Sequence, residues 1–242
     1  IKENDTGDAD GDGVPSRIGV VYPMTPVAPK NPASERDQIA ADNLFYLWNS
    51  VYLNAVIRGD FDEALDGTTI HRDDLADRMD FVGVNYYFGL TVEGTSSAFL
   101  PALSPKSTFN PLSLTPGGEN APGFYEMLMF VHDAYGLPIV VTENGMSDRE
   151  GTLASGFLVR HLYHLKRAMR DGADVRGYFY WSLMDNYEWN HGTSAYFFGL
   201  FAVDPSDPQK TRKKKPVADT YRRISTLNGL PRDLIDAHVP PE

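Results

Sequence analysis

The chain has 242 residues, 42% of them apolar, which is enough to bury the core of one large domain or two small ones. Its 22 basic and 33 acidic residues give a net charge of −11, and an acidic surface repels phosphate backbones, which disfavours general nucleic-acid binding. The lack of cysteine excludes disulfides and thiolate metal sites. No stretch approaches the roughly eighteen apolar residues of a membrane span, so we expect no membrane association.

Residues 1–17 form a polar segment rich in Gly and Asp, which we expect to be an acidic loop preceding one domain over 18–242. The chain opens "IKENDTG" without an initiator Met, so we expect the natural N-terminus to lie elsewhere. A cytoplasmic location is then the default expectation, and export stays an open alternative.

The acidic segment resembles the first half of an EF-hand calcium loop. Asp8, Asp10 and Asp12 alternate and Gly13 follows, but the twelfth position is Gly19 rather than a bidentate glutamate. A solvated acidic loop is the default interpretation, and a Ca²⁺ site on these aspartates is the alternative.

Apolar runs bounded by Gly and Pro alternate along the chain with segments of helical periodicity. Ser34 is a candidate helix N-cap, and the segment 90–122, rich in Ser, Pro, Thr and Gly, is long enough to indicate a functional loop. We expect strands at 18–22, 80–89, 138–145 and 175–185, helices at 34–58, 123–136, 153–172 and 216–227, and a further apolar stretch at 199–204. This alternation predicts an α/β fold with a parallel sheet. The length fits a (β/α)₈ barrel of about 250 residues, but four βα units make half of one.

Two other patterns are expected to be structural rather than functional. The basic run "KTRKKK" at 210–215 is short and predicted to be solvated. His161 and His164 lie three residues apart on a predicted helix, a spacing that suits a metal, but packing is the favoured interpretation because no carboxylate follows on that face.

Carboxylates, amides and large aromatic rings lie at or just beyond the carboxyl ends of three of the predicted strands. They are Asn85, Tyr86 and Tyr87; Glu143 and Asn144; and Trp181, Asp185, Asn186, Glu188, Trp189 and Phe198. The carboxyl ends of parallel strands are where α/β proteins place their chemistry. Carboxylates and amides bond sugar hydroxyls and an indole covers the apolar face of a pyranose, so the set favours a carbohydrate site. Bland alternatives remain: Glu143 can cap the next helix, Trp181 can be core, and one of the adjacent tyrosines can face the packed side of the sheet.

Three motifs, "VVTENG", "GVNYY" and "YFYWSLMDNYEWNHG…FFGLFAVD", closely resemble those of the family 1 glycoside hydrolases of the β-glucosidase type. "IGVVYPMTPVAP" and "NAVIRGDF" are similar to that family's fifth strand and the helix after it, so the resemblance runs from about 17 to 227. It implies a retaining (β/α)₈ barrel of which this chain supplies strands five to eight. It also implies an O-glycosyl hydrolase that requires no cofactor and acts on a β-glucoside or a related oligosaccharide.

By this resemblance Glu143 is the nucleophile, which forms a covalent glycosyl-enzyme that water later hydrolyses. Tyr87 corresponds to the tyrosine that hydrogen-bonds and orients this carboxylate, and Asn85 to an asparagine near the catalytic pair. We expect Gly145 to let the chain turn away directly after the nucleophile.

The resemblance assigns the sugar-binding residues to the fourth predicted strand and the loop after it. Trp181 is the platform under the sugar, Glu188 and Trp189 hold its outer hydroxyls, and Phe198 lines the same end. In the phospho-glycosidase branch a phosphate pocket replaces this region, whereas here Glu188 would repel a 6-phosphate, so we expect neutral sugars.

The sequence departs from the family in lacking the "NEP" motif that carries the acid/base glutamate. We expect that residue on a missing N-terminal half, and we expect the chain to pair with that half or to self-associate, because a half-barrel exposes strand edges and core. The alternative is a catalytically inactive half-barrel or a carbohydrate-binding remnant. Thr193 and Phe197 replace a usual Tyr and a usual basic residue, which leaves the aglycone preference open.

Overall fold

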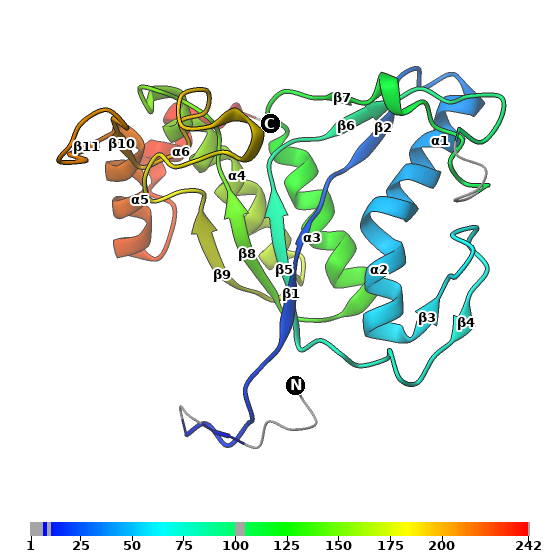
Figure 1. The fold of residues 1–242 in the computed structure, drawn as a ribbon. Helices are drawn as coiled ribbons and strands as arrows, with labels where there is room; N and C mark the ends of the chain where they lie inside the picture. Colours follow the sequence, from blue (N-terminus) through cyan, green and yellow to red (C-terminus); the bar gives the residue numbers. More distant parts are fainter. Residues whose placement is uncertain (1–6, 9–10, 100–104, 242) are drawn as a thin grey trace.

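The structure is a computed structural model that describes residues 7–8, 11–99 and 105–241. Its centre is a four-stranded parallel sheet whose members, in spatial order, are β1 (Gly19–Pro23), β5 (Phe81–Tyr86), β8 (Ile139–Asn144) and β9 (Val175–Tyr180). Figure 1 shows these strands side by side, with their carboxyl ends along the upper edge of the sheet. The α/β fold with four parallel strands is therefore confirmed.

Each strand is followed by helical segments, as the alternation predicted. They are α1 (Glu35–Phe45), the π-helical turns η2 (Tyr46–Ser50) and η3 (Asn54–Arg58) with α2 (Val51–Leu53) between them, α3 (Ala121–Tyr135), α4 (Thr152–Arg170), α5 (Pro216–Leu227) and α6 (Arg232–His238). Ser34 accepts a hydrogen bond from the Asp37 N–H and so caps α1, and the series ends at Gly59 with φ 78°. The π turns and α6 were not expected from the sequence.

Short elements lie around the central sheet. They are β2 (Val27–Pro29), β6 (Leu90–Val92) and β7 (Thr115–Pro116) in one small sheet, the 3₁₀ turns η4 (Pro111–Ser113) and η5 (Trp189–His191), and the hairpins β3 (Asp60–Phe61) with β4 (Ile70–His71) and β10 (Phe201–Val203) with β11 (Arg212–Lys214). Two expectations were wrong in detail. The predicted loop at 90–122 contains strands, and the strand expected over 175–185 ends at Tyr180.

One face of the sheet carries the hydrophobic core. Alternate residues of the two central strands point toward the helices, where they pack against α3 and α4; they are Val82, Val84, Tyr86, Ile139 and Val141 with Phe124, Leu128, Val131, Leu158 and Leu162. His161 is fully buried in this layer and stacks on Phe157, which agrees with a packing role.

The other face of the sheet is open. Val21 in β1 and Phe179 in β9 are 51% and 60% exposed, although both are large and apolar. Each alternates with residues that pack on the core, so the period of two places both on the opposite face. None of the helices in the described part of the chain combines the length and the apolar character that crossing a bilayer requires.

The basic run at 210–215 is not uniformly solvated, which corrects the expectation. Lys214 is exposed and pairs with Asp219 on the surface. Lys215 is buried, and its ammonium lies 2.9 Å from the carboxylate of Asp185. A charge pattern alone cannot separate the two neighbours, because the partner of Lys215 lies 30 residues away in the chain.

Candidate active site

The register between β5 and β8 places the carboxylate of Glu143 opposite the amide of Asn85. β5 and β8 pair Val84 with Val141 and then Asn85 with Glu143, so Thr142 is an extra residue in a β-bulge. Bulges bend a strand and re-aim its side chains. Here Thr142 Oγ1 donates to Asn85 Oδ1 at 2.6 Å, while Glu143 contacts a residue just beyond the end of the neighbouring strand β5.

That residue is Tyr87, two positions after Asn85, whose hydroxyl donates to Glu143 Oε2 at 2.5 Å. Burial and the hydrogen bond to the Glu143 carboxylate hold the pKa of Tyr87 well above its ordinary value. The phenol therefore stays protonated and acts as a donor, which fixes one oxygen of the carboxylate. The pairing predicted for Tyr87 and Glu143 is present in the structure.

Asn144 links three strands beneath this pair. Its side chain is fully buried, its Nδ2 donates to the Tyr86 carbonyl at 2.8 Å, and its Oδ1 accepts from the Tyr178 hydroxyl at 2.8 Å. Tyr86 itself packs in the core, so of the two adjacent tyrosines one is structural and the other faces Glu143. The sequence placed Asn144 at a strand end, but its cross-strand partners were not foreseen.

Gly145 is required by a close approach rather than by a turn. A Cβ at this position would lie 2.0 Å from the Trp181 carbonyl oxygen. Its φ is not among the positive values, so no left-handed conformation requires glycine here, and the expectation that Gly145 lets the chain turn away stays a prediction. The contact joins the end of β8 to the end of β9, where the Trp181 N–H also donates to the Asn144 carbonyl at 3.0 Å.

Two of the four predicted sugar-binding side chains meet each other, and a third meets Tyr87. Trp181 Nε1 donates to Glu188 Oε1 at 3.4 Å. The ring of Phe198 packs edge-on against Tyr87 with 5.9 Å between centroids. Trp189 is 85% exposed, so the structure leaves its indole largely in solvent.

The described part of the predicted calcium segment is internally hydrogen-bonded. Asp8 accepts the N–H groups of Asp12 and Gly13, and Asp12 pairs with Arg17 at 3.2 Å, while Asp10 lies outside the described residues. Over the described ranges no three Asp, Glu or His side chains form a group that could hold a metal ion. The Ca²⁺ site stays a prediction.

The chain matches the family model of glycosyl hydrolase family 1 over residues 9–230, which is most of its length. The chain belongs to glycosyl hydrolase family 1.

Relatives within family 1 carry glycosidase names. The chain is 36% identical over 234 residues to a β-galactosidase of Sulfolobus acidocaldarius, covering 93% of this chain and 46% of that protein. A β-galactosidase of Pyrococcus woesei is 30% identical over a match that covers 97% of this chain and 49% of that protein. The chain therefore spans about half the length of these curated relatives.

Solved family 1 structures have the same fold in the matched region. The β-glycosidase from Pyrococcus horikoshii superposes with a TM-score of 0.80 at 30% identity, covering 93% of this chain and 52% of that one. The β-glycosidase from Thermosphaera aggregans gives a TM-score of 0.70 at 29% identity, covering 92% and 46%. This similarity confirms the prediction that the chain supplies half of a (β/α)₈ barrel.

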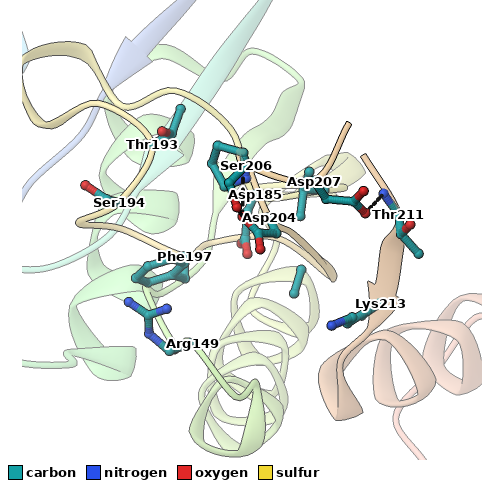
Figure 2. Close-up of a pocket in the computed structure, with 13 residues that line it drawn as sticks. Arg149, Asp185, Thr193, Ser194, Phe197, Asp204, Ser206, Asp207, Thr211 and Lys213 are labelled. Atoms are coloured by element: carbon teal, nitrogen blue, oxygen red, sulfur yellow. Dashed lines mark hydrogen bonds between the residues drawn. The ribbon is translucent and has the colours of Figure 1, made fainter. Parts of the chain in front are cut away.

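The structure of this family 1 chain contains a hollow that the sequence analysis did not predict. It has a volume of about 670 Å³ and lies between the loop after β9 and the β10–β11 hairpin (Figure 2). Arg149, whose guanidinium stacks 3.8 Å from the ring centre of Phe197, forms part of its wall with Thr193 and Lys213. Its lining includes Asp185 from the strand-end set, but not Glu143, Trp181, Glu188, Trp189 or Phe198. Thr193 and Phe197, the two departures from the family pattern, both line this hollow.

Proposed function

We propose that this chain provides the nucleophile side of a retaining β-glycosidase active site. The hydrogen bond from Tyr87 to Glu143 carries the proposal, since a carboxylate held at a strand end by a protonated phenol is oriented for attack. Family membership supports it, because the relatives are named β-galactosidases and β-glucosidases.

In this proposal a Glu143 oxygen attacks the anomeric carbon of a β-glycoside. The new C–O bond forms as the bond to the leaving oxygen breaks, and the leaving oxygen takes the electron pair and a proton from a second carboxylic acid. That second group then removes a proton from the water that hydrolyses the glycosyl-enzyme. A retaining pair needs about 5 to 5.5 Å between its carboxyl groups.

The second carboxylate is proposed to come from the other half of the barrel. This chain spans about half the length of its relatives, and its sheet has an open face on which Val21 and Phe179 are exposed. Covering this face with the remaining strands would bury both side chains and bring further polar groups toward Glu143. An N-terminal half is therefore the proposed partner, with self-association as the alternative.

The proposed substrates are neutral β-glycosides. Glu188 accepts from the Trp181 indole, which places a carboxylate at the sugar-binding end, and the buried Lys215 is already paired with Asp185. A phosphate on the sugar would meet repulsion from the Glu188 carboxylate. We expect glucose, but not glucose 6-phosphate, to slow the labelling described next, and the reverse order would contradict the assignment.

A mechanism-based label tests the nucleophile without the second carboxylate. A 2-deoxy-2-fluoroglycosyl fluoride has a leaving group that needs no protonation, so Glu143 alone can displace it. We expect intact-mass analysis to show one added fluoroglycosyl group on the wild-type chain and none on Glu143→Gln. Glu150→Gln, which removes an exposed carboxylate a few residues away, should label like the wild type. Labelling of Glu143→Gln would exclude the proposal.

A further inference from the structure

One buried ammonium joins the two ends of the loop that follows β9, residues 185–199, which we call the site loop. Lys215 Nζ donates to Asp185 Oδ1 at 2.9 Å, at the start of this loop, and to the Phe197 carbonyl at 3.0 Å, near its end. Its third hydrogen bond goes to the Asp148 carbonyl at 3.0 Å. A lysine ammonium has three donors, so all of them are used.

The lysine and its carboxylate partner are almost removed from solvent. The side chains of Lys215 and Asp185 are 3% and 6% exposed. Taking two charges out of water is costly unless each keeps its partners, and removing one partner leaves the other as an uncompensated buried charge. The pair therefore acts as one unit at the base of the site loop.

The same carboxylate also fixes the far end of the site loop. Asp185 Oδ1 accepts from the Gly199 N–H at 2.8 Å, and a Cβ on Gly199 would lie 2.2 Å from the Asp185 nitrogen. Backbone hydrogen bonds from Leu200 to Ser182 and from Lys215 to Leu200 continue this base. The loop is closed by side chains and backbone that converge on Lys215 and Asp185.

The third acceptor ties the site loop to the strand that carries Glu143. Asp148 follows β8, and its carboxylate accepts the N–H groups of Leu153 and Ala154 at the start of α4, which holds this segment in place. The Asp148 N–H also donates to the Phe197 carbonyl at 3.1 Å. Lys215 thus joins the loops after β8 and β9, the two neighbouring strands whose ends form the site.

The site loop carries three of the predicted sugar-binding residues. Phe198 precedes Gly199 and packs against Tyr87, the donor to Glu143. Glu188 accepts from the Trp181 indole. A shift of the loop base would therefore move groups on both sides of the carboxylate.

We propose that Lys215 is a positioning residue, which holds the site loop so that Glu188 and Phe198 stay against Trp181 and Tyr87. The role of the site loop in binding a glycoside rests on the proposed function, whereas the placement of the loop by Lys215 does not. The alternative is that the buried pair contributes only to overall stability.

Indole N–H signals separate these two roles without any activity assay. The chain has three tryptophans, so a ¹H–¹⁵N spectrum shows three indole cross-peaks, which single Trp→Phe variants assign. Trp181 donates to Glu188 of the site loop, whereas Trp48 donates to the Pro23 carbonyl at the end of β1 and serves as an internal reference. We expect Lys215→Met to shift or broaden the Trp181 peak and to leave Trp48 unchanged.

The adjacent lysine provides the matched control. Lys214 forms an exposed pair with Asp219, so Lys214→Met should leave all three indole peaks in place. If Lys215→Met does not fold, the near-isosteric Asp185→Asn decides in its place, with the same shift expected at Trp181. An unmoved Trp181 peak in either folded variant, or an equal shift at Trp48, overturns the proposal.

The labelling rate adds the functional readout. At a temperature where every variant is fully folded, we expect Lys215→Met to react with the 2-fluoroglycosyl fluoride at least tenfold more slowly than the wild type, and Lys214→Met to react within twofold of it. A role in stability alone would lower the melting temperature and leave the rate of the folded protein unchanged, which would contradict positioning. If the wild type itself does not label, the proposed function fails, while the indole spectra still decide the role of Lys215.

Discussion

The Tyr87 hydroxyl donates to Glu143 Oε2 at 2.5 Å, across two neighbouring strands and over 56 residues of sequence. The β-bulge at Thr142 makes this contact possible, because it places Glu143 rather than Thr142 opposite Asn85. The phenol is buried, so its proton is retained and the hydrogen bond acts on a charged acceptor.

Removing the donor should slow the reaction of Glu143 without unfolding the protein. A hydrogen bond to a charged group contributes about 1.5–3 kcal/mol, which corresponds to roughly a 10- to 100-fold change in rate. We expect Tyr87→Phe to reduce the labelling rate by this factor while the melting temperature changes little. Tyr187→Phe, which alters an exposed ring in the site loop, is the control and should label normally. A wild-type rate in Tyr87→Phe would show that the phenol does not orient the carboxylate.

Gly145 is predicted to tolerate no side chain. A methyl group there would lie 2.0 Å from the Trp181 carbonyl oxygen, and overpacking of this kind costs typically about 1–3 kcal/mol. Gly145→Ala should lower the free energy of unfolding by about this amount in urea denaturation. Gly118→Ala has open space around the new methyl group and should be neutral. Equal stabilities for the two variants would refute the steric argument.

The sequence predicted those features that depend on local pattern or on one strand end. The cap at Ser34 and the four strands lie in this class, whereas the pairing of Tyr87 with Glu143 was expected from the family resemblance. Long-range packing decided the rest. The burial of Lys215 depends on Asp185, a residue distant in sequence, and the need for glycine at 145 depends on the carbonyl of Trp181.

His161 should make the protein sensitive to acid. Burial lowers its pKa to about 4, although the nearby Phe157 carbonyl and Glu119 act in the other direction. An unfolded histidine titrates near 6.5, so between about pH 6.5 and 4 the unfolded chain binds more protons than the native one. The contribution of neutral, buried His161 to the free energy of unfolding is therefore complete above about pH 6.5 and is lost as the pH falls toward 4.

A variant that lacks only His161 tests the sign of this pH dependence. We expect the free energy of unfolding of the wild type to fall by up to about 1.4 kcal/mol per pH unit more than that of His161→Phe over this range. His71→Gln removes an exposed histidine that pairs with Asp73, and it should retain the wild-type slope. Parallel stability curves for wild type and His161→Phe would contradict the burial argument.

The open face of the sheet should promote association. Val21 and Phe179 lie exposed on it, and β1 and β9 form the two edges of the sheet. At tens of micromolar we expect sedimentation velocity to show dimers or larger species, and Val21→Lys/Phe179→Lys to shift the distribution toward monomer. Leu112→Lys changes an exposed apolar residue in η4, away from this sheet, and should have no such effect. A monodisperse wild-type monomer with one cooperative melting transition would contradict the claim that the open face of the sheet drives association.

The most direct test is to find which side chain carries the sugar after reaction with a 2-deoxy-2-fluoroglycosyl fluoride. Protease digestion and tandem mass spectrometry of the labelled chain should place the whole added mass on Glu143, within the peptide that contains the end of β8. An adduct on Glu188 or on any other carboxylate, with Glu143 unmodified, would contradict the claim that this strand end presents the nucleophile.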